Sequence, residues 1–394
     1  MKLRTLDDIS VQGKRVLMRA DFNVPLKDGV VQDESRITAT LPTIRKLVDE
    51  GVTLVLMSHL GRPKGAEDKY RLGPVAKRLS EHLGTDVRYL ATEGAASDEQ
   101  AKFVADAPEG SITLLENLRF DSRETKNNPE FAKILASYGD VFISDAFGAA
   151  HRAHASTEGV AHLLPSAAGL LLAREVSVLG NLLEAPEKPF KVILGGAKVS
   201  DKIGVMTNLI NVVDEILVGG AMAYTFFKAQ GGNVGKSLVE DDKLDVAKDI
   251  LEQANAKGVT VRLPQDSLCA TEIAEGVDTA VYPSNDIPDG YIGLDAGPDA
   301  IQVYKDSLAN AKTVLWNGPL GVFETSPFDR GTKAIAETVA ALDGYVVIGG
   351  GDSVAAINAV GLADKIDHIS TGGGASLELL EGKTLPGIAV LLVD

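Results

Sequence analysis

Arginine and histidine residues recur in the first half of the sequence, each beside a short polar motif. A guanidinium group binds carboxylate or phosphate oxygens in pairs. Any one of these residues is more often a solvated or structural side chain, but several reaching one place predict a pocket for a small anion such as a phosphorylated carboxylic acid. Asp21 and Asn23 would recognise hydroxyl groups or cap the following turn. The motifs are Asp21-Phe22-Asn23, Ser58-His59-Leu60-Gly61-Arg62, Glu116-Asn117-Leu118-Arg119, Ser144-Asp145-Ala146-Phe147-Gly148 and His151-Arg152-Ala153-His154, joined by Arg19 and Arg36.

Glycine runs take the place of these charged motifs in the second half of the sequence. A single glycine pair often does no more than allow a tight turn between a strand and a helix. Repetition at five points favours a flat surface without side chains, where a large ligand such as a nucleotide approaches the backbone. The runs are Gly195-Gly196-Ala197-Lys198, Gly219-Gly220, Gly318-Pro319, Gly349-Gly350-Gly351-Asp352-Ser353 and Gly372-Gly373-Gly374.

Two familiar nucleotide motifs do not fit these runs. Gly235-Lys236-Ser237 resembles the end of a P-loop, but position 230 holds Gln instead of the required glycine. The dinucleotide pattern G-x-G-x-x-G fails because its third glycine is replaced by Val354 in one run and by Leu377 in another. Both a P-loop nucleotide-binding protein and an NAD(P)-dependent enzyme are therefore disfavoured.

Charged residues near the glycine runs could handle phosphates and a metal ion. Lys198 and Lys202, four residues apart, would share one face of a helix and neutralise two phosphates, or else pair with Asp201 on an exposed face. Asp352 opens a helix and would serve either as its N-cap or as a ligand of Mg²⁺ held between phosphate oxygens. Glu324 could accept hydrogen bonds from ribose hydroxyls.

The elements that must position these residues alternate between short hydrophobic strands and helical stretches, which is typical of βαβ units and a parallel sheet buried on both faces. The predicted fold class is α/β, with two doubly wound, Rossmann-like domains. In such sheets ligands bind beyond the carboxyl ends of the strands, where the motifs lie. The predicted strands are residues 15–21, 53–58, 112–116 and 141–144 in the first half, and 191–194, 215–218, 260–263, 313–316, 345–348 and 367–370 in the second.

The expected domain boundaries follow from this alternation. Residues 1–170 form the anion-binding domain and 190–376 the nucleotide-binding domain. A leucine-rich stretch at 167–185, closed by Pro186 and Pro189, predicts a connecting helix, with 171–189 serving as helix and linker. The tail, 377–394, is too short for a domain of its own and is expected to pack back on the first domain.

Composition and charge exclude several classes of protein. The 394 residues are 45% hydrophobic and 24% charged, which is typical of a folded globular chain. A net charge of −16 disfavours nucleic acid and anionic membranes as partners. Cys269 is the only cysteine, so no intrachain disulfide can form. With acidic residues early in the chain and no long apolar run, we expect a cytoplasmic protein, and we expect it to be monomeric.

The motifs together resemble the phosphoglycerate kinase family along the whole chain. The likeness of the first half rests on residues 19–25, 58–63, 116–120, 145–148 and 151–154. In the second half it rests on residues 195–202, 316–319, 349–353 and 370–376. The resemblance implies reversible transfer of a phosphoryl group from 1,3-bisphosphoglycerate to ADP, giving 3-phosphoglycerate and ATP in glycolysis, with Mg²⁺ accompanying the nucleotide.

The resemblance also implies roles for individual residues. Phosphoglycerate would be bound by Asp21, Asn23, Arg36, His59, Leu60, Gly61, Arg62, Arg119 and Arg152. The nucleotide would be bound by Gly195, Lys198, Lys202, Gly293, Asn317, Glu324, Gly350, Gly351, Asp352 and Ser353, with Asp352 on the metal. The transferring group would be met by Arg36, Lys198 and the backbone of Gly350, Gly351, Gly372 and Gly373.

A mechanism consistent with these residues needs no general base, because the attacking carboxylate is already ionised at neutral pH. Arg36 from one domain and Lys198 from the other would surround the transferring group after the domains close by hinge bending. The expected pivots are residues 167–185 and 371–376.

Two other functions remain open at this point. A two-domain dehydrogenase or synthase is disfavoured by the failed dinucleotide pattern. A hinged anion-binding protein of the periplasmic type leaves the glycine runs unexplained.

Overall fold

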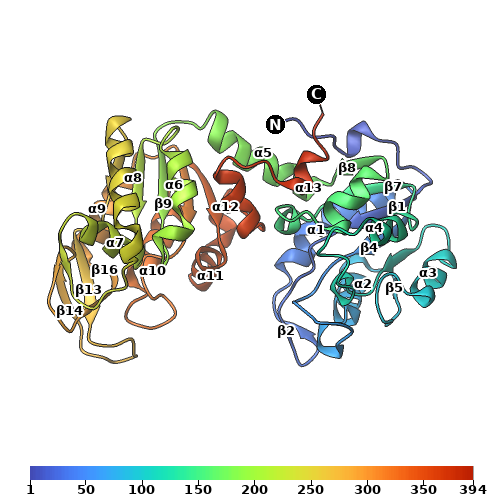
Figure 1. The fold of residues 1–394 in the computed structure, drawn as a ribbon, viewed down its shortest axis with the longest axis horizontal. Coiled ribbons are helices and arrows are strands. Elements are labelled where there is room, and N and C mark those ends of the chain that lie inside the picture. Colours follow the sequence, from blue (N-terminus) through green and yellow to red (C-terminus); the bar gives the residue numbers. More distant parts are fainter. Residues whose placement is uncertain (394) are drawn as a thin grey trace. The chain divides into compact units, whose positions relative to one another are not determined.

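The computed structural model describes residues 1–393, which divide into two compact units (Figure 1). The N-terminal unit comprises residues up to Val178 together with the segment that begins at Thr384, and the C-terminal unit is Leu179–Lys383. Each unit is built around a six-stranded parallel sheet, so the predicted fold class is confirmed.

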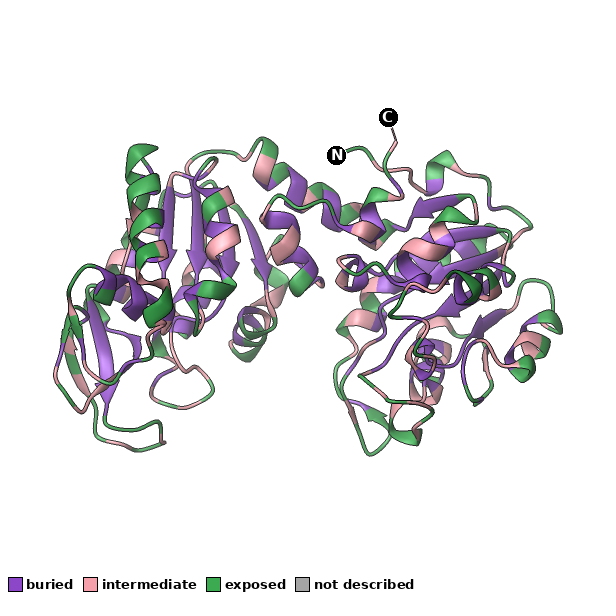
Figure 2. Ribbon diagram, viewed as in Figure 1, coloured by how far each residue is buried: buried purple, intermediate pink, exposed green. Residues whose placement is uncertain are grey.

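The sheet of the N-terminal unit has the order β5-β6-β4-β1-β7-β8, and all five pairings are parallel. Successive side chains of β1 enter different hydrophobic clusters, Val16 and Met18 one and Leu17 the other. The central strands are therefore buried on both faces (Figure 2), which explains their nearly continuous apolar sequence. The strands are β1 Arg15–Arg19, β4 Thr53–Met57, β5 Val87–Tyr89, β6 Ile112–Leu114, β7 Val141–Ser144 and β8 Ser166–Ala168.

Two pairs of helices cover the two faces of this sheet. Helices α1 (Ser35–Asp49) and α2 (Gly73–Leu83) contribute Ile44 and Leu79 to the cluster that holds Val16. Helices α3 (Asp98–Ala105) and α4 (Pro129–Ala136) pack in the cluster that holds Leu17. The side chain of Asn128 caps α4 by accepting hydrogen bonds from two backbone N–H groups of its first turn.

The C-terminal unit repeats the plan with the order β12-β10-β9-β17-β18-β19, again fully parallel. The hydrophobic cluster on one face of this sheet receives side chains from α9, α10 and α11. Its strands are β9 Phe190–Leu194, β10 Glu215–Val218, β12 Thr260–Arg262, β17 Thr313–Asn317, β18 Tyr345–Gly349 and β19 His368–Ile369. Its helices are α6 Ile203–Leu209, α7 Met222–Ala229, α8 Leu244–Ala256, α9 Pro298–Leu308, α10 Arg330–Ala340, α11 Gly351–Ala359 and α12 Gly374–Leu380.

A three-stranded antiparallel sheet in the C-terminal unit was not predicted from the sequence. It has the order β14-β13-β16, and Cys269 is buried in its central strand. Strand β14 alternates between half-buried and exposed residues and carries no apolar run, so its sequence resembles a loop. The strands are β13 Asp266–Ala270, β14 Ala280–Pro283 and β16 Ile292–Ala296. Two short pairings complete the strands: β2 Leu26–Lys27 with β3 Val30–Val31, and β11 Asn233–Val234 with β15 Asp286–Ile287.

The connecting helix begins later than predicted. Residues 167 and 168 belong to the edge strand β8, and helix α5 spans Leu170–Glu184. Two side chains accept hydrogen bonds from N–H groups in its first turn. Leu170 N donates to Thr43 Oγ1 at 3.0 Å, and Leu172 N donates to Asp145 Oδ1 at 3.1 Å. The boundary between the units falls inside this helix, after Val178.

The C-terminal tail also differs from the expectation. It packs on the N-terminal unit only from Thr384 onward, through α13 (Pro386–Ala389) and the bond from Gly387 N to Ala150 O at 2.9 Å. Residues 377–383 belong to the C-terminal unit, where Asn208 Nδ2 donates to Leu380 O at 2.8 Å and helps to hold α12 on α6.

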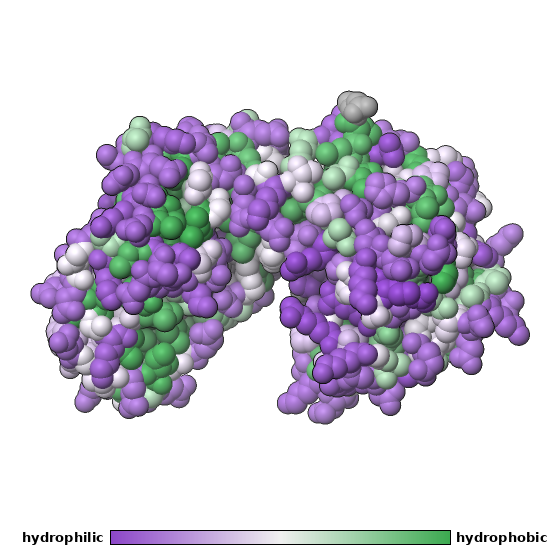
Figure 3. Space-filling view, in the orientation of Figure 1, coloured by the Kyte–Doolittle hydropathy of each residue, from purple (hydrophilic) through white to green (hydrophobic). Residues whose placement is uncertain are grey.

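The visible surface of both units is mostly hydrophilic (Figure 3). Within residues 1–393, none of the helices combines the length and the apolar composition that crossing a bilayer requires.

Candidate active site

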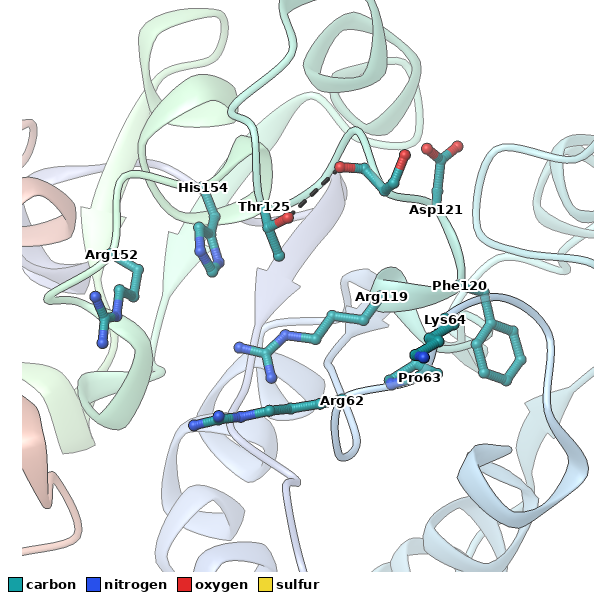
Figure 4. Close-up of a pocket in the computed structure, with 10 residues that line it drawn as sticks. Arg62, Pro63, Lys64, Arg119, Phe120, Asp121, Thr125, Arg152 and His154 are labelled. Atoms are coloured by element: carbon teal, nitrogen blue, oxygen red, sulfur yellow. Dashed lines mark hydrogen bonds between the residues drawn. The ribbon is translucent and has the colours of Figure 1, made fainter.

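Three of the predicted arginines line one cavity of about 610 Å³ in the N-terminal unit. Arg62 follows β4, Arg119 follows β6 and Arg152 follows β7, so their loops meet at the carboxyl edge of the parallel sheet. The side chains of Arg62 and Arg119 extend in the same direction, and Arg152 and His154 stand across from them (Figure 4). We call this the basic cavity.

Arg36 and His59 are not among the residues that line the basic cavity, but both lie beside its arginines. The charges of Arg36 and Arg119 both act on the ring of His59. Arg36 Nη1 is 2.9 Å from Asp21 Oδ2, with Asp21 buried and Arg36 one third exposed. Asp21 therefore holds a guanidinium group, and its other oxygen accepts a hydrogen bond from Asn23 N at 3.2 Å.

Asn117 ties the loops of the site together. This buried amide accepts hydrogen bonds from Leu60 N and Arg119 N, and its Nδ2 donates to Leu60 O at 2.8 Å and Tyr70 O at 2.9 Å. Arg119 Nη1 in turn donates to Gly61 O at 2.7 Å. All four hydrogen bonds of Asn117 join segments far apart in the sequence or fix a turn, so its role is to position Arg119 and the loop after β4.

Arg19 lies apart from the exposed arginines. It is fully buried at the end of β1, where its Nε donates to Ser156 Oγ at 2.8 Å and its Nη2 is 2.9 Å from His59 Nδ1. Glu124 is also fully buried, and its Oε1 accepts a hydrogen bond from Ser156 Oγ at 2.5 Å. From the sequence, Arg19 was expected among the cations of the anion pocket, and Glu124 and Ser156 were not expected at the site. The burial of a polar or charged side chain leaves no local signal in the sequence.

The histidines of this site are neutral at pH 7. Burial, followed by the charges of Arg19 and Arg119, holds the pKa of His59 well below its ordinary value. The same causes lower the pKa of His154 to about 4, so its contact with Glu124 at 3.8 Å is not an ion pair. The positive charge of the site therefore comes from the arginines, and the histidines contribute hydrogen-bonding groups.

The glycine runs of the C-terminal unit line a second cavity of about 620 Å³, which we call the glycine cavity. Gly195 shows why a side chain is excluded: a Cβ there would lie 2.7 Å from the carbonyl oxygen of Gly318. Gly350 has a φ of +88°, which glycine adopts without strain. The predicted nucleotide residues that line the cavity are Gly195, Lys198, Lys202, Asn317, Gly350, Gly351, Asp352 and Gly373.

One prediction about the glycine cavity is corrected, and two other predicted residues do not line it. Lys198 and Lys202 do not share a helix face, because Val199–Asp201 form a 3-10 turn and α6 begins only at Ile203. Both nevertheless line the cavity. Ser353 is buried and its Oγ accepts a hydrogen bond from Gly318 N at 2.6 Å, so its hydroxyl holds a loop together. Gly372 is buried and is not among the lining residues.

Lys202 and Asn317 are buried residues that line the glycine cavity. The Lys202 ammonium donates to Asn317 Oδ1, and burial lowers the pKa of Lys202 while the carboxylates of Asp201 and Asp352 oppose that shift. Within residues 1–393, Asn317 Nδ2 is buried without a hydrogen-bond partner. A buried donor without a partner is costly, so this amide is poised for an acceptor oxygen of a ligand.

A third cavity, of about 340 Å³, adjoins the glycine cavity and shares Gly196 and Asp352 with it. Gly293 and Glu324, both predicted from the resemblance, line it. Its other walls include Leu238, Ile273, Ile292, Leu294 and Val322, which the sequence analysis missed. We call it the apolar slot, because most of its lining side chains are apolar, as is common in sites for small organic ligands.

Among the described residues 1–393, no three His, Cys, Asp or Glu side chains are grouped as a metal site. Asp352 is exposed at the first turn of α11 and lines both the glycine cavity and the apolar slot. A single carboxylate fits Mg²⁺ when phosphate oxygens and water supply the other ligands.

Comparison with known proteins places the chain among close relatives. Residues 6–383 match the family model described as phosphoglycerate kinase. The chain belongs to the phosphoglycerate kinase family. The phosphoglycerate kinase of Thermus thermophilus is 54% identical over 390 residues, 99% of this chain and 100% of the relative. That of Deinococcus radiodurans is 55% identical over 392 residues, 99% of this chain and 94% of the relative.

Solved structures of phosphoglycerate kinases share the fold. The enzyme from Coxiella burnetii superposes with a TM-score of 0.90 at 40% identity, covering 99% of both chains. The phosphoglycerate kinase from Pyrococcus horikoshii gives a TM-score of 0.84 at 30% identity, covering 99% of this chain and 98% of that one. The dehydrogenase and periplasmic-protein alternatives are set aside by this membership.

Proposed function

We propose that this member of the phosphoglycerate kinase family transfers a phosphoryl group reversibly from 1,3-bisphosphoglycerate to ADP, giving 3-phosphoglycerate and ATP in glycolysis. It is a phosphotransferase with a carboxyl group as acceptor (EC 2.7.2.3). The observation that carries the proposal is a pair of dissimilar cavities in a member of this family. One is lined by arginines and lies in the N-terminal unit, and the other is lined by glycines and lies in the C-terminal unit.

The acid substrate binds in and beside the basic cavity. Arg62, Arg119 and Arg152 supply the charge that a phosphate and a carboxylate need, in a chain whose net charge of −16 otherwise repels anions. His59, Asn23 and the backbone of Leu60 and Gly61 complete the contacts. Arg36, oriented by Asp21, faces the group being transferred.

The nucleotide binds in the C-terminal unit. Its base enters the apolar slot, Glu324 accepts the ribose hydroxyls, and the phosphates lie in the glycine cavity against Lys198, Lys202 and Asn317 Nδ2. Bare backbone at Gly195, Gly350, Gly351 and Gly373 lets phosphate oxygens approach the N–H groups. Asp352 would hold Mg²⁺, which neutralises phosphate charge when it is bound.

The chemical step requires little from the protein beyond position and charge. In the ATP-consuming direction a carboxylate oxygen of 3-phosphoglycerate attacks the γ-phosphorus, and the bond to the bridging oxygen of ADP breaks. The carboxylate carries no proton at neutral pH, so no base is used. Arg36, Lys198 and backbone N–H groups stabilise the charge on the moving group.

The two ligands bind to different units, so transfer requires them to be brought together and water to be excluded from the acyl phosphate. We assign this movement to hinge bending, with α5 and residues 371–376, which include the start of α12, as pivots. The partners are these small molecules only, and we propose that the protein works as a monomer in the cytoplasm.

The direct test is ATP- and Mg²⁺-dependent phosphorylation of 3-phosphoglycerate, followed by coupling the acyl phosphate to NADH oxidation. The purified chain should turn over, and Arg36→Ala should lower kcat steeply while the affinity for ATP stays nearly unchanged. Arg45→Ala is the matched control, because Arg45 lies on the same helix and is exposed. Phosphoglycerate binding without turnover would instead favour an anion-binding protein.

Asp352→Ala tests the other cavity. It should weaken binding of Mg-ATP and leave the affinity for 3-phosphoglycerate intact, because the variant removes only the metal-facing carboxylate. Asp364→Ala serves as control, since Asp364 is exposed and lines neither cavity. Isothermal titration with each ligand separates the outcomes, and loss of phosphoglycerate affinity in Asp352→Ala would contradict the assignment.

A further inference from the structure

The contact between Arg19 and His59 determines the protonation of the histidine ring. Arg19 Nη2 is 2.9 Å from His59 Nδ1, and both residues are buried. A guanidinium group has hydrogen-bond donors only, so Nδ1 must accept and cannot carry a proton. A neutral imidazole with a bare Nδ1 has its proton on Nε2.

Arg19 is itself held by a buried network of hydrogen bonds. Its Nε donates to Ser156 Oγ at 2.8 Å, and its Nη1 donates to Ala20 O. Ser156 passes the interaction on, because its hydroxyl donates to Glu124 Oε1 at 2.5 Å while its N–H donates to Glu124 Oε2 at 3.1 Å. We call Arg19, Ser156 and Glu124 the buried relay. The charges of Glu124 and Asp21 oppose the effect of burial on the pKa of Arg19.

We infer that the buried relay fixes His59 as its neutral Nε2–H tautomer, so that His59 offers the acid substrate a hydrogen-bond donor and not a positive charge. Arg19 is then a positioning residue that acts through His59. The inference rests on the proposed function for the identity of the substrate, but the tautomer itself is a property of the free protein.

The surrounding charges support the same state. The groups that act on His59 are Arg19, Arg119, Arg36 and His154, and together with burial they all lower its pKa. The nearby carboxylates face the arginines: Glu124 and Asp21 both act on Arg19, and burial raises the pKa of Glu124. Protonation would add a charge beside three guanidinium groups and would break the bond from Arg19. His59 therefore stays neutral through the physiological pH range.

A neutral donor has a functional consequence. The basic cavity already carries three arginines for the phosphate and carboxylate of the ligand. A fixed Nε2–H adds direction to the recognition without a further charge to desolvate. Binding of 3-phosphoglycerate should then be insensitive to His59 titration between about pH 5.5 and 7.5, the range around the ordinary pKa of histidine.

The first test is ¹⁵N NMR of the histidine rings in the ligand-free protein, with His59 assigned by comparison with His59→Gln. The His59 signals should show an Nε2–H ring that does not titrate between pH 5.5 and 7.5. In Arg19→Lys the positive charge opposite Glu124 is kept but the fork of donors is lost, so both tautomers should appear. An Nδ1–H or protonated ring in the unmodified protein, or an unchanged tautomer in Arg19→Lys, would overturn the inference.

A double variant guards against a folding defect. Arg19→Met alone leaves the Glu124 carboxylate buried without a counter-charge, whereas Arg19→Met with Glu124→Gln removes both charges. In the double variant His59 should begin to titrate, at a pKa nearer its ordinary value. Arg123→Lys is the matched control, because Arg123 is an arginine of the same unit that pairs with Asp121 at the surface, and its His59 signals should not move.

Kinetics then test the consequence for binding. Arg19→Lys should raise KM for 3-phosphoglycerate about tenfold, the effect of one lost or misdirected hydrogen bond to a charged group, with KM for ATP unchanged. The increase should be confined to KM for 3-phosphoglycerate, because a merely structural role would move both KM values or the melting temperature. A changed tautomer with an unchanged KM would overturn the role in recognition while leaving the kinase assignment intact. Absence of all kinase activity would remove the proposed function, and the NMR result would still decide the tautomer.

Discussion

Individual residues of the basic cavity differ in charge although all are basic by type. Arginine keeps its proton under desolvation because its ordinary pKa is so high, whereas histidine, with an ordinary pKa near 6.5, loses it. Burial and the neighbouring guanidinium groups therefore leave His59 and His154 neutral beside charged Arg119. The basic cavity and the residues beside it thus combine fixed charges with neutral hydrogen-bonding groups, which suits a molecule with both anionic and hydroxyl groups.

The lowered pKa of His154 predicts a loss of stability in acid. In the unfolded chain a histidine binds a proton below about pH 6.5, while in the folded protein the pKa of His154 is about 4. The unfolded state therefore takes up the proton first, and the folded state should lose about 2 kcal/mol between pH 7 and pH 5 from this one residue. His154→Gln should abolish that part of the pH dependence.

Urea unfolding at pH 7 and pH 5 measures the difference. The comparison is between slopes with pH, so a constant effect of the substitution on stability cancels. His162→Gln is a suitable control because His162 is exposed. Equal acid sensitivity of His154→Gln and the unmodified protein would show that His154 is protonated as easily in the folded as in the unfolded state.

At the scale of elements, the loops after the parallel strands carry both cavities, but they are held in different ways. In the N-terminal unit a buried side chain, Asn117, bonds the loops to one another. In the C-terminal unit the loops are held by direct packing of backbone on backbone, as where Gly195 N donates to Asn317 O at 3.0 Å. The second arrangement lets stretches of bare backbone line the cavity beside charged side chains such as Lys198, Lys202 and Asp352.

Two glycines of that wall should respond differently to alanine. A methyl group at Gly195 would lie 2.7 Å from backbone atoms of Gly318 and Pro319, so Gly195→Ala should cost about 1 to 3 kcal/mol or more in stability. A methyl at Gly351 meets nothing within 4 Å and stands in the first turn of α11, so Gly351→Ala should keep or slightly raise the melting temperature. If phosphates approach the bare backbone there, Gly351→Ala should still weaken ATP binding.

Thermal unfolding and calorimetric titration with Mg-ATP distinguish these effects. The informative result is the second variant, in which stability and ligand affinity are expected to move independently. Normal ATP affinity in a stable Gly351→Ala protein would mean that the glycine serves the turn alone.

At the scale of the whole molecule, each unit has its own core, its own sheet and its own candidate ligand site. Phosphoryl transfer needs reacting atoms within about 3 to 3.5 Å, so the proposed hinge bending has to bring the two bound ligands to that separation.

Solution scattering tests this movement. The radius of gyration should be smallest when 3-phosphoglycerate and Mg-nucleotide are both present, because only then do the ligands bridge the units. Each ligand alone should give less compaction. Full compaction by a single ligand would argue against closure driven by both.

The sequence alone was sufficient to predict the alternation of strands and helices, the two parallel sheets and the segments that carry the site. These features depend on local patterns: apolar runs of strand length, glycines where a turn needs them, and charged motifs at strand ends. Arg62, Arg119 and Arg152 were predicted to come together because the carboxyl ends of neighbouring parallel strands share one edge, and they line one cavity.

Only the tertiary structure decided which charged residues are buried and what they contact. Arg19 lies inside while Arg62 lies outside, although each closes or follows a strand. Arg19 donates a hydrogen bond to Ser156, which lies 137 residues later in the sequence, and Ser156 in turn donates one to Glu124. Such pairings are set by packing. The antiparallel sheet around β13 and the turn between Lys198 and Lys202 were likewise missed, because long-range contacts override weak local preferences there.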